Sequence, residues 1–256
     1  MRTATVSEII GAIEEHAARE PGGAIAFDGD GTLWSGDIGE DFFAALLADG
    51  RLTEVARQAL AREAEAEKVG TSGTAVEIAH AIHAAYLAGT FPEERVCEIM
   101  TWACAGWTRA ELDAFAARVM NGLGIAARLH GEAMRIVRWA DERGIPVFLV
   151  SASPRAIVEA AAHHVRVDLA RVASATEVTE GGVVQPAVHR PIPYGPGKVA
   201  RLREKLGTRS LYAAFGDNAF DVALLREAKV PVAIRPKARL VERAAEVPGL
   251  ATLERI

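Results

Sequence analysis

The spacing of hydrophobic residues changes along the chain, and each change predicts a different kind of element. Residues 6–19 place their apolar side chains on one helical stripe, which predicts an amphipathic helix ending at a Pro-Gly-Gly sequence. Residues 24–27 are entirely apolar and are followed directly by Asp-Gly-Asp-Gly. A short apolar run that ends in turn residues is typical of a buried parallel strand.

The middle of the chain, residues 39–122, has helical spacing throughout. It is rich in alanine and nearly free of alternating β-branched residues, so it predicts helices rather than strands. Glycine-containing breaks at 49–50, 70–73, 89–90 and 121–122 divide this region into segments. The predicted helices are residues 40–48, 53–68, 74–87, 92–105 and 108–120.

Strand and helix patterns alternate from residue 132 onward. Strands are predicted at 146–150, 171–174, 210–215 and 230–234, and helices at 132–143, 154–164, 197–206, 219–229 and 236–246. Residues 176–178 and 183–188 flank Gly181-Gly182 and predict a hairpin. This alternation predicts an α/β fold with a Rossmann-like, doubly wound and mostly parallel sheet.

The helical region interrupts this α/β pattern. We therefore predict an α/β core domain of residues 1–37 and 129–256, with a helical cap domain of residues 38–128 inserted into it. A cap in this position would close over a site on the core. The alternative is a helical subdomain that has no gating role.

Composition and charge narrow the class of protein. The chain has 256 residues, half of them hydrophobic, and a net charge of −5, which is ordinary for a soluble globular protein. We expect no nucleic-acid or membrane partner, and either a monomer or a homodimer. Cys97 and Cys104 would lie about 10 Å apart on one helix, too far for a disulfide. Free thiols and the lack of a signal peptide or membrane-spanning run favour a cytoplasmic location.

Two carboxylates come directly after the strand at 24–27. Asp28 and Asp30 would lie at the carboxyl end of a parallel strand, where ligands of open α/β sheets bind. Carboxylates placed together there are costly unless a cation or a reaction requires them. The pattern indicates a magnesium-assisted reaction in which Asp28 attacks an electrophile and Asp30 moves a proton. The alternative is an ordinary turn.

Polar groups also follow the strand at 146–150. Ser151 and Ala152 are predicted to bind an anion with a hydroxyl and free backbone N–H groups, while Ser153 is interpreted as the cap of a helix beginning at Pro154. Lys198, just inside a helix after a glycine-rich loop, would add a positive charge to the same anion. A solvated surface lysine is the alternative.

A further acid follows the strand at 210–215. Asp217 could share a hard cation with Asp28, and Asp221 could support the site from behind. Asp217 and Asn218 could also cap the helix predicted at 219–229, and the two roles are compatible.

In these residues the chain resembles the haloacid dehalogenase superfamily of hydrolases. The resemblance covers about residues 24–235, and the insertion after the first motif is similar to the helical cap of the phosphoserine-phosphatase-like branch. The four motifs appear in the family's order, as Asp28-x-Asp30-x-Thr32, Ser151, Lys198 and Gly216-Asp217-x-x-x-Asp221.

The resemblance implies a role for each motif residue. Asp28 would be the nucleophile that forms an aspartyl phosphate, and Asp30 the general acid and base. The phosphoryl group would be bound by Thr32, Ser151, Ala152 and Lys198. Mg²⁺ would be the cofactor, held by Asp28, Asp217 and the backbone carbonyl of Asp30, with Asp221 and Asn218 behind these ligands.

Other residues near the motifs are candidates for substrate specificity. Asp37 stands at the position of a glutamate that reads the substrate amine in phosphoserine phosphatases, and Glu40 is nearby; both could instead cap the following helix. Phe220 replaces an asparagine that is usual in that branch. Arg128 could line the cleft.

Aromatic residues offer a second means of recognition. Trp34, with Trp102, Trp107 or Tyr86, could form an aromatic wall for a quaternary ammonium, or these residues could simply pack between helices. Near the carboxyl terminus a group of cations is interpreted as a solvated patch, consisting of Arg235, Lys237 and Arg239.

The sequence thus predicts a magnesium-dependent phosphatase that acts on a small phosphorylated metabolite. The candidate substrates resemble phosphoserine, phosphocholine or phosphoethanolamine. The alternatives are a phosphotransferase or phosphomutase that uses the same intermediate, and a non-catalytic binding protein with the same fold.

Overall fold

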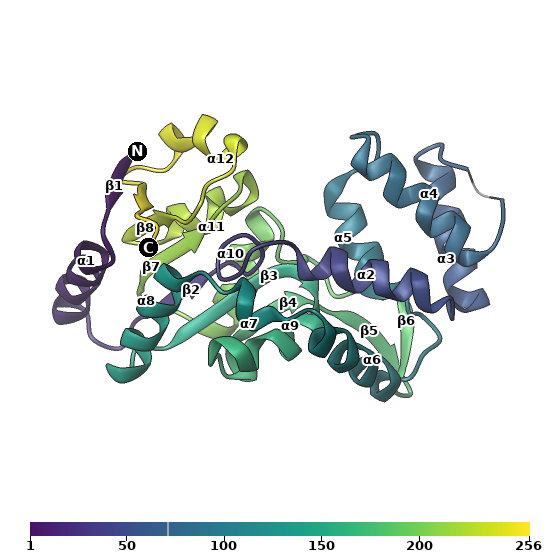
Figure 1. The fold of residues 1–256 in the computed structure, drawn as a ribbon, viewed down its shortest axis with the longest axis horizontal. Coiled ribbons are helices and arrows are strands. Elements are labelled where there is room, and N and C mark those ends of the chain that lie inside the picture. Colours follow the sequence, from purple (N-terminus) through teal and green to yellow (C-terminus); the bar gives the residue numbers. More distant parts are fainter. Residues whose placement is uncertain (71) are drawn as a thin grey trace.

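The computed structural model describes residues 1–70 and 72–256; residue 71, in the predicted break at 70–73, lies outside the described residues. Its centre is a sheet of seven strands, in which every neighbouring pair is parallel (Figure 1). In spatial order the strands are β1 (Arg2–Ala4), β9 (Ala251–Leu253), β8 (Val230–Ala233), β7 (Leu211–Gly216), β2 (Ala24–Phe27), β3 (Val147–Pro154) and β4 (Val172–Ala175). The predicted α/β class is confirmed.

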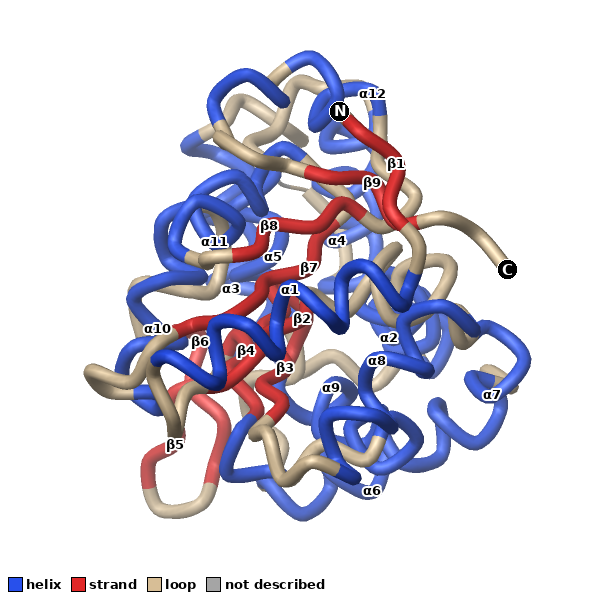
Figure 2. Tube along the Cα trace, turned by 90° about the vertical axis from the view of Figure 1, so that its left-hand side faces the viewer, coloured by secondary structure: helices blue, strands red, loops and turns tan. Residues whose placement is uncertain are grey.

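Strand β2 lies between β7 and β3, which explains why all four of its residues are apolar and fully buried. Phe27 stacks on Phe215 of β7 with 4.0 Å between ring centroids. Helices cover both faces of the sheet, as Figure 2 shows. One face packs against α1 (Val6–Arg19), α8 (Gly131–Glu142) and α9 (Arg155–Ala162), and the other against α10 (Pro196–Leu206), α11 (Val222–Glu227) and α12 (Ala238–Glu242).

A block of helices follows β2, and most of it lies at one end of the molecule (Figure 1). The five predicted helices are present with small changes at their ends, and a four-residue helix, α7, follows them. Threonine caps at Thr53, Thr74 and Thr108 start three of the helices. The block consists of α2 (Ile38–Asp49), α3 (Glu54–Ala66), α4 (Ala75–Leu87), α5 (Glu93–Trp102), α6 (Arg109–Gly122) and α7 (Ile125–Arg128).

The predicted hairpin is confirmed as β5 (Glu177–Glu180) and β6 (Val183–Val188). Its second strand bonds to the connection between α5 and α6. Gly106 N–H donates to the Val184 carbonyl, and Val184 N–H donates to the Trp107 carbonyl, both at 2.9 Å. These hydrogen bonds join the helical block to the hairpin, which lies between β4 and β7 in the sequence.

The structure differs from the sequence prediction mainly in short elements. Strands β1 and β9 have three residues each, too few for an alternating pattern to be recognised. The helix predicted at 236–246 is shorter and is divided into α12 and the 3-10 turn Ala244–Glu246. Among the described residues, no helix combines the length and the apolar character needed to cross a bilayer.

Candidate active site

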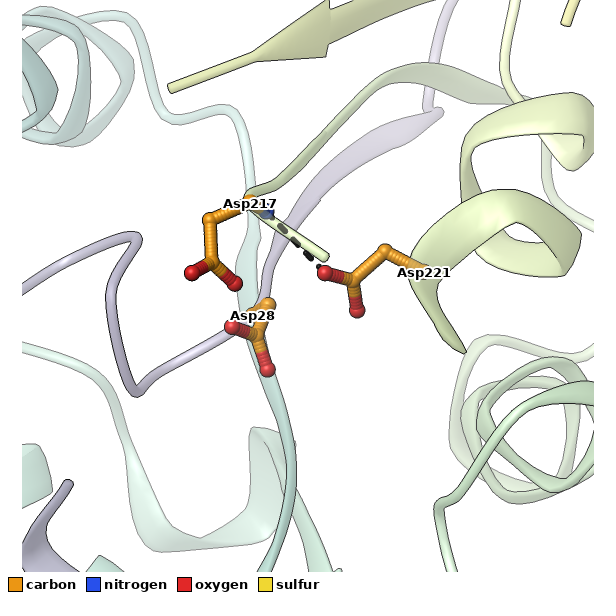
Figure 3. Close-up of side chains that lie close together, drawn as sticks. All are labelled: Asp28, Asp217 and Asp221. Carbon is orange, nitrogen blue, oxygen red and sulfur yellow. Dashed lines mark hydrogen bonds between the residues drawn. The ribbon is translucent and has the colours of Figure 1, made fainter. Parts of the chain in front are cut away.

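The carboxyl ends of three adjacent strands bring the predicted site residues together. Asp28 follows β2, Ser151 lies near the end of β3, and Asp217 follows β7. The three carboxylates of Asp28, Asp217 and Asp221 point toward one another in Figure 3, and each offers an oxygen within 4.8 Å of the others. All three side chains are buried. The structure thus gathers residues that are far apart in the sequence.

A buried lysine connects two of these carboxylates. Lys198 is 0% exposed, and its Nζ lies 2.5 Å from Asp28 Oδ1 and 2.5 Å from Asp221 Oδ1. Burial alone would lower the pKa of Lys198, but Asp221 and Asp28 outweigh burial and raise that pKa above its ordinary value. Lys198 is therefore a charged ammonium at neutral pH. The solvated surface lysine considered as an alternative is wrong.

The other oxygen of Asp28 is held by the first motif itself. Thr32 donates its hydroxyl to Asp28 Oδ2 at 3.1 Å. Burial raises the pKa of the Asp28 carboxyl, and the Lys198 ammonium opposes that rise. Both oxygens of Asp28 are thus oriented by neighbouring donors, so the carboxylate has a fixed direction.

Asp221 holds the loop that carries Asp217. Its Oδ2 accepts the backbone N–H groups of Asp217 and Asn218, each at 3.0 Å, while its Oδ1 accepts from Lys198. Asn218 caps the following turn by accepting the Ala219 N–H at 2.7 Å. Because Asp221 holds the backbone of the loop that carries Asp217, it fits a supporting position behind the ligands.

Asp217 has one partnered oxygen and one that is free. Its Oδ2 accepts from Lys237 Nζ at 2.9 Å, whereas its buried Oδ1 has no hydrogen-bond partner among the described residues. Burial and the charge of Asp221 raise the pKa of Asp217 to about 6, although Lys237 opposes this rise. An unpartnered carboxylate oxygen beside Asp28 fits a hard divalent cation, which prefers oxygen ligands.

Asp30 lies beside this cluster and accepts hydrogen bonds on both oxygens. Oδ1 accepts the indole N–H of Trp34 at 2.8 Å and the backbone N–H of Ile38 at 2.7 Å. Oδ2 accepts the hydroxyl of Ser153 at 2.7 Å and that of Ser151 at 3.4 Å. The Oδ1 donors have no acceptor capacity, but the hydroxyls near Oδ2 can also accept. A proton carried by Asp30 therefore belongs on Oδ2.

The interpretation of Ser153 as a helix cap is wrong. Strand β3 continues through Pro154, which occupies the cap position of α9 without a side-chain hydrogen bond. The Ser153 side chain instead turns toward Asp30. The continuous apolar run ends at Val150, but β3 continues to Pro154, so the strand extends into the site.

Gly31 is required where the first motif passes Asp217. It has a φ of +80°, and a Cβ added there would lie 2.1 Å from Asp217 Oδ2. Both the left-handed backbone and the lack of space exclude a side chain.

Replacing Gly31 with alanine is expected to lower the free energy of unfolding by about 3 kcal/mol, because backbone strain and the clash with Asp217 add together. Gly50→Ala is the matched control: Gly50 has a φ of +74° but nothing within 4 Å of its added Cβ. Gly50→Ala should lower the free energy of unfolding by only about 1 kcal/mol. Urea unfolding measures both values, and equal losses would contradict a role for the clash.

A pocket with a cavity volume of about 50 Å³ lies above these residues. Asp28, Asp30 and the 151–154 segment form its base, and α2, α4 and α5 supply residues that line it. The remaining lining residues are Asp37, Glu40, Tyr86, Glu93, Val96, Cys97, Met100, Tyr194, Phe220 and Lys237.

A family model described as haloacid dehalogenase-like hydrolase matches residues 25–226, which include the first motif and the last acid at Asp221. The chain belongs to the haloacid dehalogenase-like hydrolase family. A comparison with curated proteins gives no match.

Solved structures similar to this family member include a protein of unknown function from Bordetella pertussis Tohama I. It is 21% identical, with a TM-score of 0.67 over 90% of this chain and 97% of that chain. A substrate-bound phosphoserine phosphatase complex is 15% identical, with a TM-score of 0.52 over 91% and 93% of the two chains. A phospho-aspartyl intermediate analogue of phosphoserine phosphatase is 16% identical, with a TM-score of 0.55 over 91% and 94%. These similarities establish the fold.

The candidate specificity residues of this hydrolase lie in different places relative to the pocket. Asp37 and Glu40 line the pocket, and Asp37 also caps α2 by accepting the Glu40 N–H at 2.9 Å. Arg128 does not line the pocket; it pairs with Asp41 at 2.5 Å. Trp34 is fully buried, and its indole N–H donates to Asp30.

The tryptophans of the helical block pack inside it. Trp102 and Trp107 are buried and do not line the pocket, and Trp107 meets Phe115 edge to face with centroids 5.4 Å apart. The packing interpretation is confirmed for both. Tyr86 does line the pocket, together with Tyr194 and Phe220, whose local sequence gives no sign of a binding role.

The interpretation of Arg235, Lys237 and Arg239 as a solvated patch is wrong for Arg235, and for Lys237 it holds only in part because this 55% exposed side chain has a partner in the site. Arg235 pairs with the buried Glu132 at 2.8 Å, and Lys237 pairs with Asp217. Arg239 is the most solvated of the three, with a side chain 77% exposed, and it lies 3.6 Å from Glu93. The first two partners are distant in sequence, so no local pattern indicates these pairs.

Proposed function

We propose that this hydrolase is a magnesium-dependent phosphatase that acts on a small phosphomonoester through an aspartyl phosphate on Asp28. One observation carries the proposal. At the base of this pocket, the Asp28 carboxylate is fixed by the buried Lys198 ammonium beside Asp217, which has an unpartnered oxygen. The phosphoserine phosphatases among the structures of the same fold agree with this proposal.

The first step forms a bond between an Asp28 carboxylate oxygen and phosphorus while the ester P–O bond breaks. Lys198 balances the charge of the transferred group, and Ser151 and Ala152 lie where its oxygens would bind. Thr32 orients the attacking carboxylate. Asp30 gives the proton on Oδ2 to the leaving alkoxide, so that an alcohol departs.

The second step returns the enzyme to its starting state. Asp30, now ionised, takes a proton from water as the water oxygen attacks phosphorus. The bond from phosphorus to Asp28 breaks, its electron pair returns to the Asp28 carboxylate, and inorganic phosphate leaves. Ser153 and the indole of Trp34 hold Asp30 in one position for both proton transfers.

The divalent cation would be held by Asp28, Asp217 and the backbone carbonyl of Asp30. Bound Mg²⁺ supplies positive charge that offsets the charge of the reacting phosphoryl group. Asp221 and Asn218 support this arrangement by fixing the loop that carries Asp217.

A chelator is expected to remove all measurable phosphate release, and added Mg²⁺ is expected to restore it, because two buried acids need a cation's charge. The assay uses phosphoserine, phosphocholine, phosphoethanolamine, sugar phosphates and a chromogenic aryl phosphate. Release that is unchanged by the chelator would contradict the metal requirement. Added acceptor alcohols distinguish hydrolysis from phosphotransfer by the phosphorylated product.

The upper part of the pocket supports a substrate with a cationic end, such as phosphoserine, phosphocholine or phosphoethanolamine. Three acids, Asp37, Glu40 and Glu93, line it together with the rings of Tyr86 and Tyr194. Carboxylates attract an ammonium, and aromatic faces bind quaternary ammonium groups.

Replacing Glu40 with glutamine is therefore expected to raise KM for the preferred cationic substrate about tenfold, the loss of one charged contact. The aryl phosphate, which has no cation, should keep its KM within about twofold and serves as the control. Steady-state kinetics measures both. An equal rise for both substrates would show that Glu40 only supports the fold, through its 2.6 Å contact with His83.

A further inference from the structure

The connection between β8 and α12 runs alongside the loop that carries Asp217. Ile234 N–H donates to the Gly216 carbonyl at 3.0 Å, and Lys237 N–H donates to the Asp217 carbonyl at 2.7 Å. These two bonds extend the pairing of β7 with β8 beyond the strand ends. The backbone of Lys237 is thus held next to that of Asp217.

Arg235, which lies between Ile234 and Lys237, is also fixed. Arg235 adopts a left-handed backbone conformation with φ of +46°, which is uncommon for a residue with a side chain. Its Nε lies 2.8 Å from Glu132 Oε1, and Glu132 is 1% exposed. The ion pair holds the turn that directs Lys237 back toward the site.

The side chain of Lys237 completes an asymmetric environment around Asp217. Lys237 Nζ lies 2.9 Å from Oδ2, while the buried Oδ1 has no partner among the described residues. Lys198 has no part in this contact, since it bridges Asp28 and Asp221. One oxygen of Asp217 is therefore occupied by an ammonium, and the other is buried and has no partner among the described residues.

We propose that Lys237 is a positioning residue that makes Asp217 a one-oxygen ligand and thereby selects Mg²⁺ against Ca²⁺. The inference rests on the metal site of the proposed function. Mg²⁺ requires near-octahedral geometry, which suits single carboxylate oxygens, whereas Ca²⁺ accepts six to eight oxygens and carboxylates bound through both. With Oδ2 held by Lys237, Asp217 supplies the first kind of ligand and not the second.

The test is calorimetric titration of the full chain with Mg²⁺ alone and Ca²⁺ alone, in the wild type and in Lys237→Met. Removing the ammonium changes the repulsion of both divalent cations alike, so the ratio of their Kd values isolates the geometric effect. The ratio is expected to shift toward Ca²⁺ about tenfold. The 55% exposed side chain of Lys237 favours a folded variant, and Lys237→Ala replaces it if Lys237→Met does not fold.

Two controls make the result specific. Lys237→Arg retains a donor for Oδ2 and should keep the wild-type ratio within about threefold. Arg239→Met removes a nearby positive charge that does not contact Asp217 and should leave the ratio unchanged. A ratio that stays constant in Lys237→Met, or that shifts equally in Arg239→Met, overturns the inference while the proposed phosphatase stands. If no variant binds either cation, the metal site of the proposed function is overturned together with it.

Discussion

Asp28→Asn is expected to lower the rate of phosphate release by about 10⁴-fold or more, because an amide cannot replace the carboxylate as nucleophile. The variant should remain folded. Burial already raises the pKa of Asp28, so its charged form is costly in this environment, and Asp221 stays in place as a partner of Lys198. The measurement is phosphate release from the best phosphomonoester of the panel in the presence of Mg²⁺.

A matched control is Asp41→Asn, which removes a carboxylate that pairs with Arg128 and does not line the pocket. It should retain most of the wild-type rate. Release by Asp28→Asn at more than about one tenth of the wild-type rate would rule out Asp28 as the nucleophile. If the wild type also released no phosphate from any panel member, the binding-protein alternative would be favoured instead.

The second large effect is expected on stability. Lys198→Met should lower the free energy of unfolding by about 3–5 kcal/mol, because it leaves the carboxylates of Asp28 and Asp221 buried without their shared cation. The pKa of Lys198 is raised in the folded state, so its contribution is fully present at neutral pH and is lost only as the pH rises through that raised value. Phosphate release should be lost as well.

Lys205→Met provides the control, since Lys205 is an exposed lysine on the same helix, α10. Its substitution should change the free energy of unfolding by less than about 0.5 kcal/mol. Urea unfolding at pH 7 compares the two variants. A loss below about 1 kcal/mol for Lys198→Met would contradict the view that this lysine neutralises the buried acids.

The sequence predicts the site residues well where an acid follows an apolar strand. Asp28 and Asp217 each follow an apolar run of four or more residues, so a sheet topology alone brings them to one edge. The α/β class follows from the alternation of strand and helix patterns in the same way. Both features depend on local spacing, which a single sequence contains.

The contacts that complete the site depend on tertiary structure instead. Lys237 and Ser153 reach Asp217 and Asp30 across the sheet edge, at sequence separations that no periodicity reveals. A serine before a proline is a common cap, and a lysine between two arginines is commonly solvated, so the local sequence reveals neither contact. Tyr194 reaches the pocket in a similar way, next to Phe220.

Phe220 illustrates a departure from the family motif that the structure explains in part. Its ring lies 5.0 Å from Lys198 Nζ and lines the pocket. An aromatic face there contacts the ammonium and keeps water away from it. The usual asparagine of the phosphoserine-phosphatase-like branch would be a polar residue at this position.

Trapping the covalent intermediate tests the central claim most directly. The experiment uses Asp30→Asn with the chromogenic aryl phosphate, whose leaving group needs no proton, so the first step proceeds while hydrolysis of the intermediate is slowed. The reaction is quenched in acid and the peptides are analysed by mass spectrometry. The account predicts one added phosphoryl group on the peptide that contains Asp28. Aryl alcohol release without this modification, or a phosphoryl group on Ser151 instead, would contradict it.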